Sequence, residues 1–117
     1  MPKENLIRNK SFVFAQRIVS LYKYLTEKKK EYVLSKQTLR SGTAIAALIR
    51  EAEHAESKAD FIHKISIALK EAGETELWID LLKHGEYISD KEYNSIRPQI
   101  AELNKILIAI KKSAKGN

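Results

Sequence analysis

One pair of residues in this sequence has the spacing of metal ligands. Glu51 and His54 stand three positions apart, and bundles that hold two iron ions use Glu-x-x-His on two helices plus a glutamate from each of two others. Glu71 and Glu74 could supply further carboxylates. However, the sequence contains only one Glu-x-x-His, and the inward face expected for residues 11–28 offers no carboxylate. We therefore expect no metal site and no other cofactor.

Other catalytic chemistry is also poorly represented. Cysteine is absent, which excludes thiol nucleophiles, disulfides and thiolate metal sites. The serines stand at expected helix starts or beside small residues rather than in a Gly-x-Ser-x-Gly elbow, and the glycines are isolated rather than gathered in a phosphate-binding loop. We expect a protein that is not an enzyme.

A set of charged residues on two expected helices suggests ion pairing. The set comprises Arg40, Glu51, Glu71 and Glu74. Arg40 and Glu51 share a helical face with Ala44 and Ala47, small residues that let another chain segment come close. Charges in such a place are tolerated when they are mutually paired. The set predicts an ion network, either buried or between subunits; the alternative is that all four side chains are solvated.

Length and composition favour one soluble, all-α domain. The chain has 117 residues with four Gly and two Pro, and no alternating apolar pattern bounded by turn dipeptides is present. The first residues lack the apolar core of a signal peptide, and no apolar run approaches the roughly 20 residues that span a bilayer. We expect a cytoplasmic protein.

The spacing of apolar residues predicts four helices, at about 11–28, 35–55, 57–83 and 90–112. Joined by short links, they predict an up-down-up-down antiparallel four-helix bundle that forms a single domain over residues 1–117. Residues 1–10 are expected to be a partly ordered lead-in, and residues 113–117 a polar tail.

Local signals mark several boundaries of these helices. Ser57 with Asp60 and Ser89 with Glu92 have the spacing of capping boxes, so each pair predicts a helix start. Gly85 predicts a helix end. Pro98 lies inside the last helix, where it removes one N–H and clashes with the preceding turn, so a kink or a break is expected there.

The helix at 57–83 has more apolar surface than one buried stripe requires. Its core stripe runs through Phe61, Ile65, Ala68, Ala72, Thr75, Ile79 and Leu82. Ile67 and Trp78 lie on one flank, with Leu77 and Leu81 further round. A helix that is apolar on several sides is normally buried on several sides. We expect a subunit interface formed by Arg40, Ala44, Ala47, Glu51, Ile67, Glu71, Glu74 and Trp78.

Basic charge points to an anionic partner. The net charge is +6, and residues 1–40 hold ten Lys or Arg against three acidic residues, whereas residues 41–82 are net acidic. Lys and Arg neutralise phosphates without reading sequence. The expected nucleic-acid-binding residues are Arg17, Lys23, Lys28, Lys29, Lys30 and Lys36. Aromatic residues fall mostly on inner stripes, so stacking on single strands has little support.

The middle of the chain resembles a known family. The stretches that carry the resemblance are Gln37-x-x-Arg40-Ser41-Gly42-Thr43-x-Ile45, Glu51-Ala52, Ser57-Lys58-Ala59-Asp60-Phe61-Ile62-x-Lys64 and Ile67-Ala68-x-Lys70-Glu71-Ala72-x-Glu74-Thr75-x-x-Trp78. They resemble the bacterial four-helix-bundle proteins encoded by 23S rRNA intervening sequences, a family that includes the accessory protein of diversity-generating retroelements. The chain departs from the family at Leu48-Ile49-Arg50-Glu51, where Asn-Ile-Ala-Glu is usual, and at Ala44, where Ser is usual.

This resemblance implies an antiparallel bundle that assembles as a homopentamer and has a basic surface able to bind RNA or DNA. For the retroelement relative it also implies association with a reverse transcriptase. Taken together, these features predict a non-enzymatic, oligomeric bundle that binds structured nucleic acid. The alternative is a protein-interaction scaffold without a nucleic-acid ligand.

Overall fold

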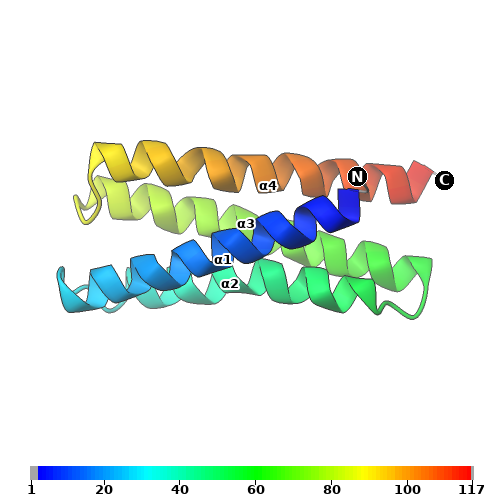
Figure 1. Cartoon of the computed structure of the whole chain (residues 1–117), viewed down its shortest axis with the longest axis horizontal. Helices are drawn as coiled ribbons and strands as arrows, with labels where there is room; N and C mark the ends of the chain where they lie inside the picture. The colour runs from blue at the N-terminus through cyan, green and yellow to red at the C-terminus, as the bar shows by residue number, and fades with distance from the viewer. Residues whose placement is uncertain (1–2, 117) are drawn as a thin grey trace.

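The computed structural model describes residues 3–116, and throughout that range the chain is an antiparallel four-helix bundle (Figure 1). The helices are α1 (Lys3–Glu27), α2 (Leu34–Glu53), α3 (Lys58–His84) and α4 (Asp90–Gly116). Each helix packs on the next one in sequence, and α1 also meets α4, although this last contact is the smallest. The elongated body measures 46 × 22 × 21 Å. No helix in the described part of the chain has both the length and the apolarity to cross a membrane.

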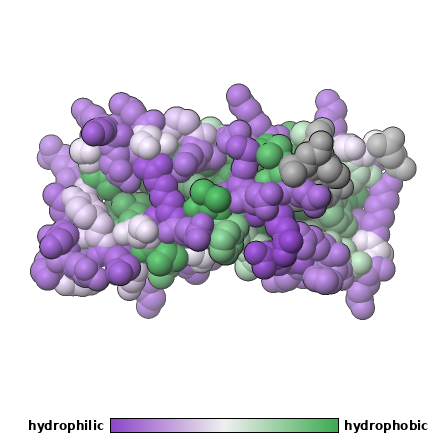
Figure 2. Space-filling model, in the orientation of Figure 1, coloured by the Kyte–Doolittle hydropathy of each residue, from purple (hydrophilic) through white to green (hydrophobic). Residues whose placement is uncertain are grey.

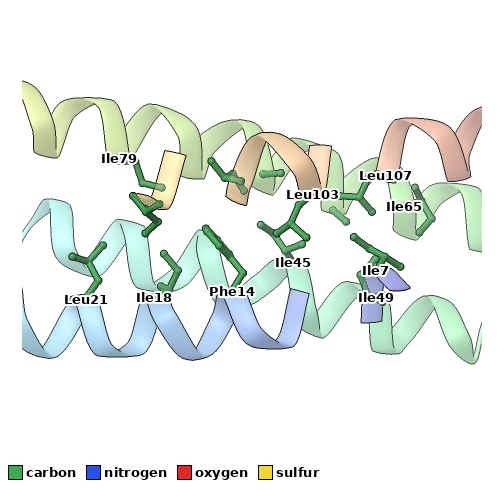
Figure 3. Close-up of a cluster of buried hydrophobic side chains, with 14 of the residues drawn as sticks. Ile7, Phe14, Ile18, Leu21, Ile45, Ile49, Ile65, Ile79, Leu103 and Leu107 are labelled. Carbon is green, nitrogen blue, oxygen red and sulfur yellow. The ribbon is translucent and has the colours of Figure 1, made fainter. Parts of the chain in front are cut away.

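One apolar stripe from each helix forms the core (Figure 3). The predicted inner positions of α3 are buried from Ile65 to Leu82, and Phe61 packs against their edge. The stripes of the other helices meet them, with Phe14, Ile45 and Leu103 pointing into the shared interior. Because residues three and four positions apart share one helical face, this spacing is sufficient to place the core correctly.

Two helices are longer than the sequence predicted. The expected lead-in is helical from Lys3, because Ile7 continues the apolar stripe one heptad before Phe14 and is only 1% exposed. The expected polar tail is also helical as far as Gly116, since α4 continues beyond the buried Ile110. At the start of α1 the stripe itself continues into the polar segment, whereas α4 extends past its last buried residue, Ile110.

Pro98 does not break α4, which runs through it as one continuous helix. Proline leaves the carbonyl four residues earlier, that of Asn94, without its helical N–H partner. Asn94 and Pro98 are both exposed, so water can satisfy that carbonyl. The predicted break is therefore wrong, because the proline lies on the wet side of the helix.

The predicted helix starts are confirmed in part. The Ser57 hydroxyl accepts from the backbone N–H of Asp60 at 3.0 Å, and the Ser89 hydroxyl from that of Glu92 at 3.1 Å. The carboxylates do not complete the reciprocal bonds of a capping box. Asp60 instead accepts from the N–H of Glu56, and Glu92 pairs with Arg17 on α1.

Gly85 follows α3 as predicted, but it is not the residue with left-handed backbone. Its φ is −79°, whereas Glu86 has a φ of 63°. The N–H of Tyr87 then reaches back to the carbonyl of Leu82 at 3.0 Å, as in a Schellman-type helix end. Glycine suits position 85 for a steric reason, since a Cβ there would lie 2.8 Å from the Tyr87 ring.

The link between α1 and α2 is fixed by one carboxylate. Glu31 is buried, and its two oxygens accept from the backbone N–H groups of Val33, Leu34 and Ser35 at 3.2, 3.0 and 2.7 Å. Burial alone raises the pKa of Glu31, but these N–H groups outweigh it and hold the pKa below its ordinary value of 4.5. Glu31 thus caps α2.

Gly42 accommodates a core side chain of the neighbouring helix. It is buried on α2, where a Cβ would lie 2.9 and 3.0 Å from Cγ1 and Cγ2 of Ile18 on α1. The close approach at Gly42 is therefore made by a side chain of α1 rather than by its backbone. Gly73 offers a contrast, since it is exposed on α3 with nothing within 4 Å of an added Cβ.

Replacing these two glycines with alanine should have opposite effects on stability. Alanine gains about 1 kcal/mol over glycine in a helix, so G73A should raise the free energy of unfolding by up to that amount. In G42A this gain is outweighed by overpacking against Ile18, which costs about 1–3 kcal/mol. Urea unfolding of both variants tests this, and a G42A protein as stable as G73A would contradict the close packing.

Replacing Glu31 with glutamine should lower the free energy of unfolding by about 1–2 kcal/mol at neutral pH, because charge-assisted hydrogen bonds are lost. Since the folded pKa is lowered, the stabilisation is complete above the ordinary pKa of 4.5 and is lost as the pH falls through the folded value. Urea unfolding of wild type and E31Q should therefore converge in acid. E27Q, at an exposed residue of the same turn, is the control and should change little at any pH.

Candidate nucleic-acid interface

Four lysines gather at the end of the bundle where α1 leads into α2, shown on the left of Figure 1. We call Lys28, Lys29, Lys30 and Lys36 the basic pole. All four are exposed, and none forms an ion pair with any residue that the structure describes. Lys23, one turn earlier on α1, is likewise exposed and unpaired within the described range. Five of the six residues predicted to bind nucleic acid are thus available to a ligand.

Arg17, the sixth predicted residue, is engaged within the chain. Its Nη2 lies 3.2 Å from a Glu92 carboxylate oxygen, and its Nη1 donates to Gln99 at 2.9 Å. Its side chain is only 24% exposed. Arg17 therefore connects α1 to α4, and its charge is largely neutralised where it stands.

Six other basic side chains are paired with a carboxylate on a neighbouring helix. The pairs are Arg8–Glu53, Lys10–Glu102, Arg40–Glu71, Arg40–Glu74, Lys64–Glu51, Lys83–Asp90, Arg97–Glu76 and Arg97–Asp80. Asp90 bonds to Lys83 and raises its pKa, so this lysine, although at the same end of the bundle, contributes little free charge. Within residues 3–116, no ion pair is formed either by the lysines near the end of α4, which are Lys111, Lys112 and Lys115, or by Arg50, Lys58, Lys70, Lys91 and Lys105.

The backbone of the basic pole is held in place by the Glu31 cap. Lys30 has a φ of 55°, and the N–H of Glu31 bonds to the carbonyl of Leu25 at 2.9 Å. The N–H groups of residues 33–35 are occupied by the Glu31 carboxylate. These three N–H groups are therefore not available to an anion, whereas the lysine side chains are exposed.

Two exposed tyrosines flank the lysines, and the sequence reasoning missed them. Tyr24 is 43% exposed, with the Lys29 Nζ 6.0 Å from its ring centroid, and Tyr32 is 59% exposed. The sequence expectation placed most aromatic residues on inner stripes. The available signal was that Tyr24 directly precedes the core residue Leu25 and so lies off the stripe, while Tyr32 belongs to the link rather than to a helix.

The predicted subunit interface lies along the outer face of α2 and α3. Arg40 on α2 donates to Glu71 at 3.1 Å and to Glu74 at 2.6 Å on α3, and the bond to Glu71 is the main cause of its raised pKa. Glu51 stands apart from this network, because it pairs with Lys64 at 3.1 Å. The ion network is therefore formed within one chain from three of the four residues, and the Arg40 side chain is 50% exposed.

Apolar side chains on α3 lie beside these charges. Ile67 and Trp78 are half-buried by their own chain, whereas Leu77 and Leu81 are 51% and 37% exposed. The Trp78 Nε1 is inaccessible to solvent and has no hydrogen-bond partner among the described residues. On α2, Ala44 is half-buried and Ala47 is exposed, so small residues stand on the same helix as Arg40 and Glu51.

The residues considered as metal ligands do not converge. No group of three or more potential ligand side chains occurs within residues that the structure describes. Glu51 pairs with Lys64, and Glu71 and Glu74 pair with Arg40.

The sequence and the fold can be compared with known proteins. A crystal structure of a protein of unknown function from the S23 ribosomal protein family of Bacteroides thetaiotaomicron VPI-5482 is similar, with 57% sequence identity and a TM-score of 0.94. The match covers 95% of this chain and 99% of that one. A search among curated proteins gave no match.

A family model also matches this chain. The model for the 23S rRNA-intervening sequence protein matches residues 3–109, which includes all of α1, α2 and α3 and most of α4. The chain therefore belongs to the family of 23S rRNA-intervening sequence proteins.

Proposed function

We propose that this protein is a non-enzymatic, self-associating bundle that binds structured RNA or DNA through the basic pole. The observation that carries the proposal is the free charge there. Lys28, Lys29, Lys30 and Lys36 are exposed and unpaired within the described chain, and the link that presents them is fixed by Glu31. Several cations along the sides of the bundle are instead paired with a carboxylate of a facing helix.

Such a surface suits a phosphate backbone. Each phosphate that a lysine neutralises releases a counterion, so the affinity falls as the salt concentration rises. The slope of the logarithm of the binding constant against the logarithm of the salt concentration is about −0.9 per contact on duplexes and about −0.7 on single strands. With Lys23 the surface offers five lysines, which limits the slope to roughly −4 to −5 on a duplex. We expect affinity that depends steeply on salt and little on sequence.

Removing the charge of the pole should reduce both affinity and salt dependence. In K28Q/K29Q/K30Q, binding of a labelled structured RNA at low salt should weaken at least about tenfold, and the salt slope should become shallower by about 3. Fluorescence anisotropy across a salt series measures both quantities. The matched control is K111Q/K112Q/K115Q, which loses the same charge at the far end of α4 and should bind nearly as well as wild type.

Two results would overturn the nucleic-acid proposal. One is an absence of binding by wild type at low salt, which leaves the protein-interaction scaffold as the surviving function. The other is equal weakening by the two triple variants, because net charge rather than the basic pole would then explain the affinity.

We further propose that the outer face of α2 and α3 joins subunits, in a homopentamer as the family resemblance implies. Leu77 and Leu81 are exposed beside the Arg40 ion network, and the small residue Ala47 leaves room for close approach. Contiguous exposed apolar surface on a soluble protein commonly marks an interaction site.

A charge placed on this face should dissociate the assembly without unfolding the chain. Ala47 is exposed, so A47E should leave the circular dichroism spectrum unchanged while light scattering reports a smaller mass than wild type. V19E, at a residue on α1 that is 45% exposed, is the control and should keep the wild-type mass. A monomeric wild type at micromolar concentration, or an A47E protein of undiminished mass, would contradict the proposed interface.

A further inference from the structure

Two shallow hollows meet at Tyr24, close to the basic pole. The first, of about 360 Å³, is lined by Tyr24, Lys29, Lys83, Glu86, Ile88, Ser89 and Asp90. The second, of about 410 Å³, is lined by Arg17, Ser20, Leu21, Tyr24, Ile88, Ser89 and Glu92. They share Tyr24, Ile88 and Ser89, so the exposed tyrosine and an isoleucine border both. The hollows lie where α1 faces the turn between α3 and α4.

Figure 2 shows the face of the bundle in the orientation of Figure 1, with hydrophobic surface in the seam between α1 and α4 and hydrophilic side chains around it. Ile88 is a buried residue, and it gives each hollow an apolar element. A flat, uncharged ring system with polar edges, such as a nucleobase, matches a site that combines an aromatic ring, an apolar residue and a hydroxyl.

The charges around the hollows favour different positions for the base and the phosphate of a nucleotide. Asp90 is paired with Lys83 at 2.9 Å and Glu92 with Arg17 at 3.2 Å, so each hollow contains a nearly neutral ion pair. Glu86, which is exposed and has no ion pair in the described range, repels a phosphate that enters the first hollow. Free positive charge comes from Lys29, which lines the first hollow, and from the other lysines of the basic pole, which lie outside both hollows. This arrangement favours an uncharged base inside and a phosphate beside the lysines.

Exposed aromatic rings next to cations are the elements with which proteins bind single strands, because every base has a face that can stack. Tyr24 has the Lys29 ammonium 6.0 Å from its ring centroid, and Tyr32 is exposed on the link that the Glu31 cap fixes. In a duplex both faces of each base are covered by neighbouring base pairs. Only an unpaired nucleotide can use these rings.

From this geometry we infer that the basic pole selects unpaired nucleotides, with Tyr24 stacking a base at the two hollows, Tyr32 offering a second ring and the lysines holding the phosphates. This inference rests on the proposed function and narrows it from nucleic acid in general to loops, bulges and single-stranded ends. Tyr24 is the residue that determines the preference.

The test compares a labelled oligoadenylate with a blunt RNA duplex of the same length, using the full chain and fluorescence anisotropy at low salt. Wild type should bind the single strand more tightly than the duplex. Y24L, which keeps an apolar side chain but loses the ring, should bind the single strand about fivefold or more weakly, because stacking on an aromatic side chain is worth about 1–3 kcal/mol per base. Its affinity for the duplex should not change.

Matched variants separate stacking from other effects. Y24F keeps the ring and should bind like wild type. F12L removes another exposed ring of α1, one that has the Arg50 guanidinium 5.7 Å from its centroid but lies outside the basic pole, and it should bind both ligands like wild type. Y32L changes a residue that lies outside the helices and is 59% exposed, and it should also weaken single-strand binding.

The outcomes distinguish this inference from the proposed function. If K28Q/K29Q/K30Q weakens binding while Y24L and Y32L hold the single strand as tightly as wild type, stacking is overturned and phosphate binding stands. If wild type prefers the duplex, the inference is likewise overturned. If neither ligand binds wild type at low salt, the proposed function fails as well. Should Y24L fail to fold, the comparison of Y32L with F12L decides the matter.

Discussion

Burial of one continuous apolar stripe on each helix is the constraint on which the rest of this structure depends. The stripe of α3 is nearly inaccessible from Ile65 to Leu82, and a helix of this length can be covered only by partners of similar length. That requirement explains why α1 and α4 continue into segments of mainly polar sequence. It also keeps the charged side chains other than Glu31 away from the core, so the surface pattern follows from the core.

The pattern of charges reflects which side chains have a facing helix. Along the sides, a lysine or arginine can reach a carboxylate on its neighbour, as Arg97 does with Glu76 and Asp80. At the turn between α1 and α2 no helix lies opposite, and the one buried carboxylate, Glu31, is occupied by backbone N–H groups. Positive charge therefore stays uncompensated at that end for a geometric reason. The exposed ion pairs along the sides of the bundle contribute little stability. Their main effect here is on where a charged ligand can bind.

Periodicity predicted the four helices, their order and nearly all of the core, because burial repeats along a helix and can be read position by position. It failed where the outcome depends on one local contact. Pro98 is tolerated because it lies on the exposed side, whereas Gly85 ends α3 as predicted, followed by the left-handed Glu86. For the candidate site, the exposed lysines were predicted, but Arg17 is neutralised by Glu92, a pairing that sequence spacing cannot reveal across different helices. Exposure of Tyr24 depends likewise on how α1 meets α4.

The packing between α1 and α4 is the least extensive in the bundle. Contacts between α1 and α4 are the smallest of the four helix pairs, and polar bridges from Lys10 and Arg17 cross an open seam there. Local openings of a native protein use its least-packed boundary first, so in this fold the boundary between α1 and α4 opens at the lowest free-energy cost. Tyr24 lies on α1 and Ile88 precedes α4. The width of the two hollows that these residues border is therefore coupled to the opening between α1 and α4.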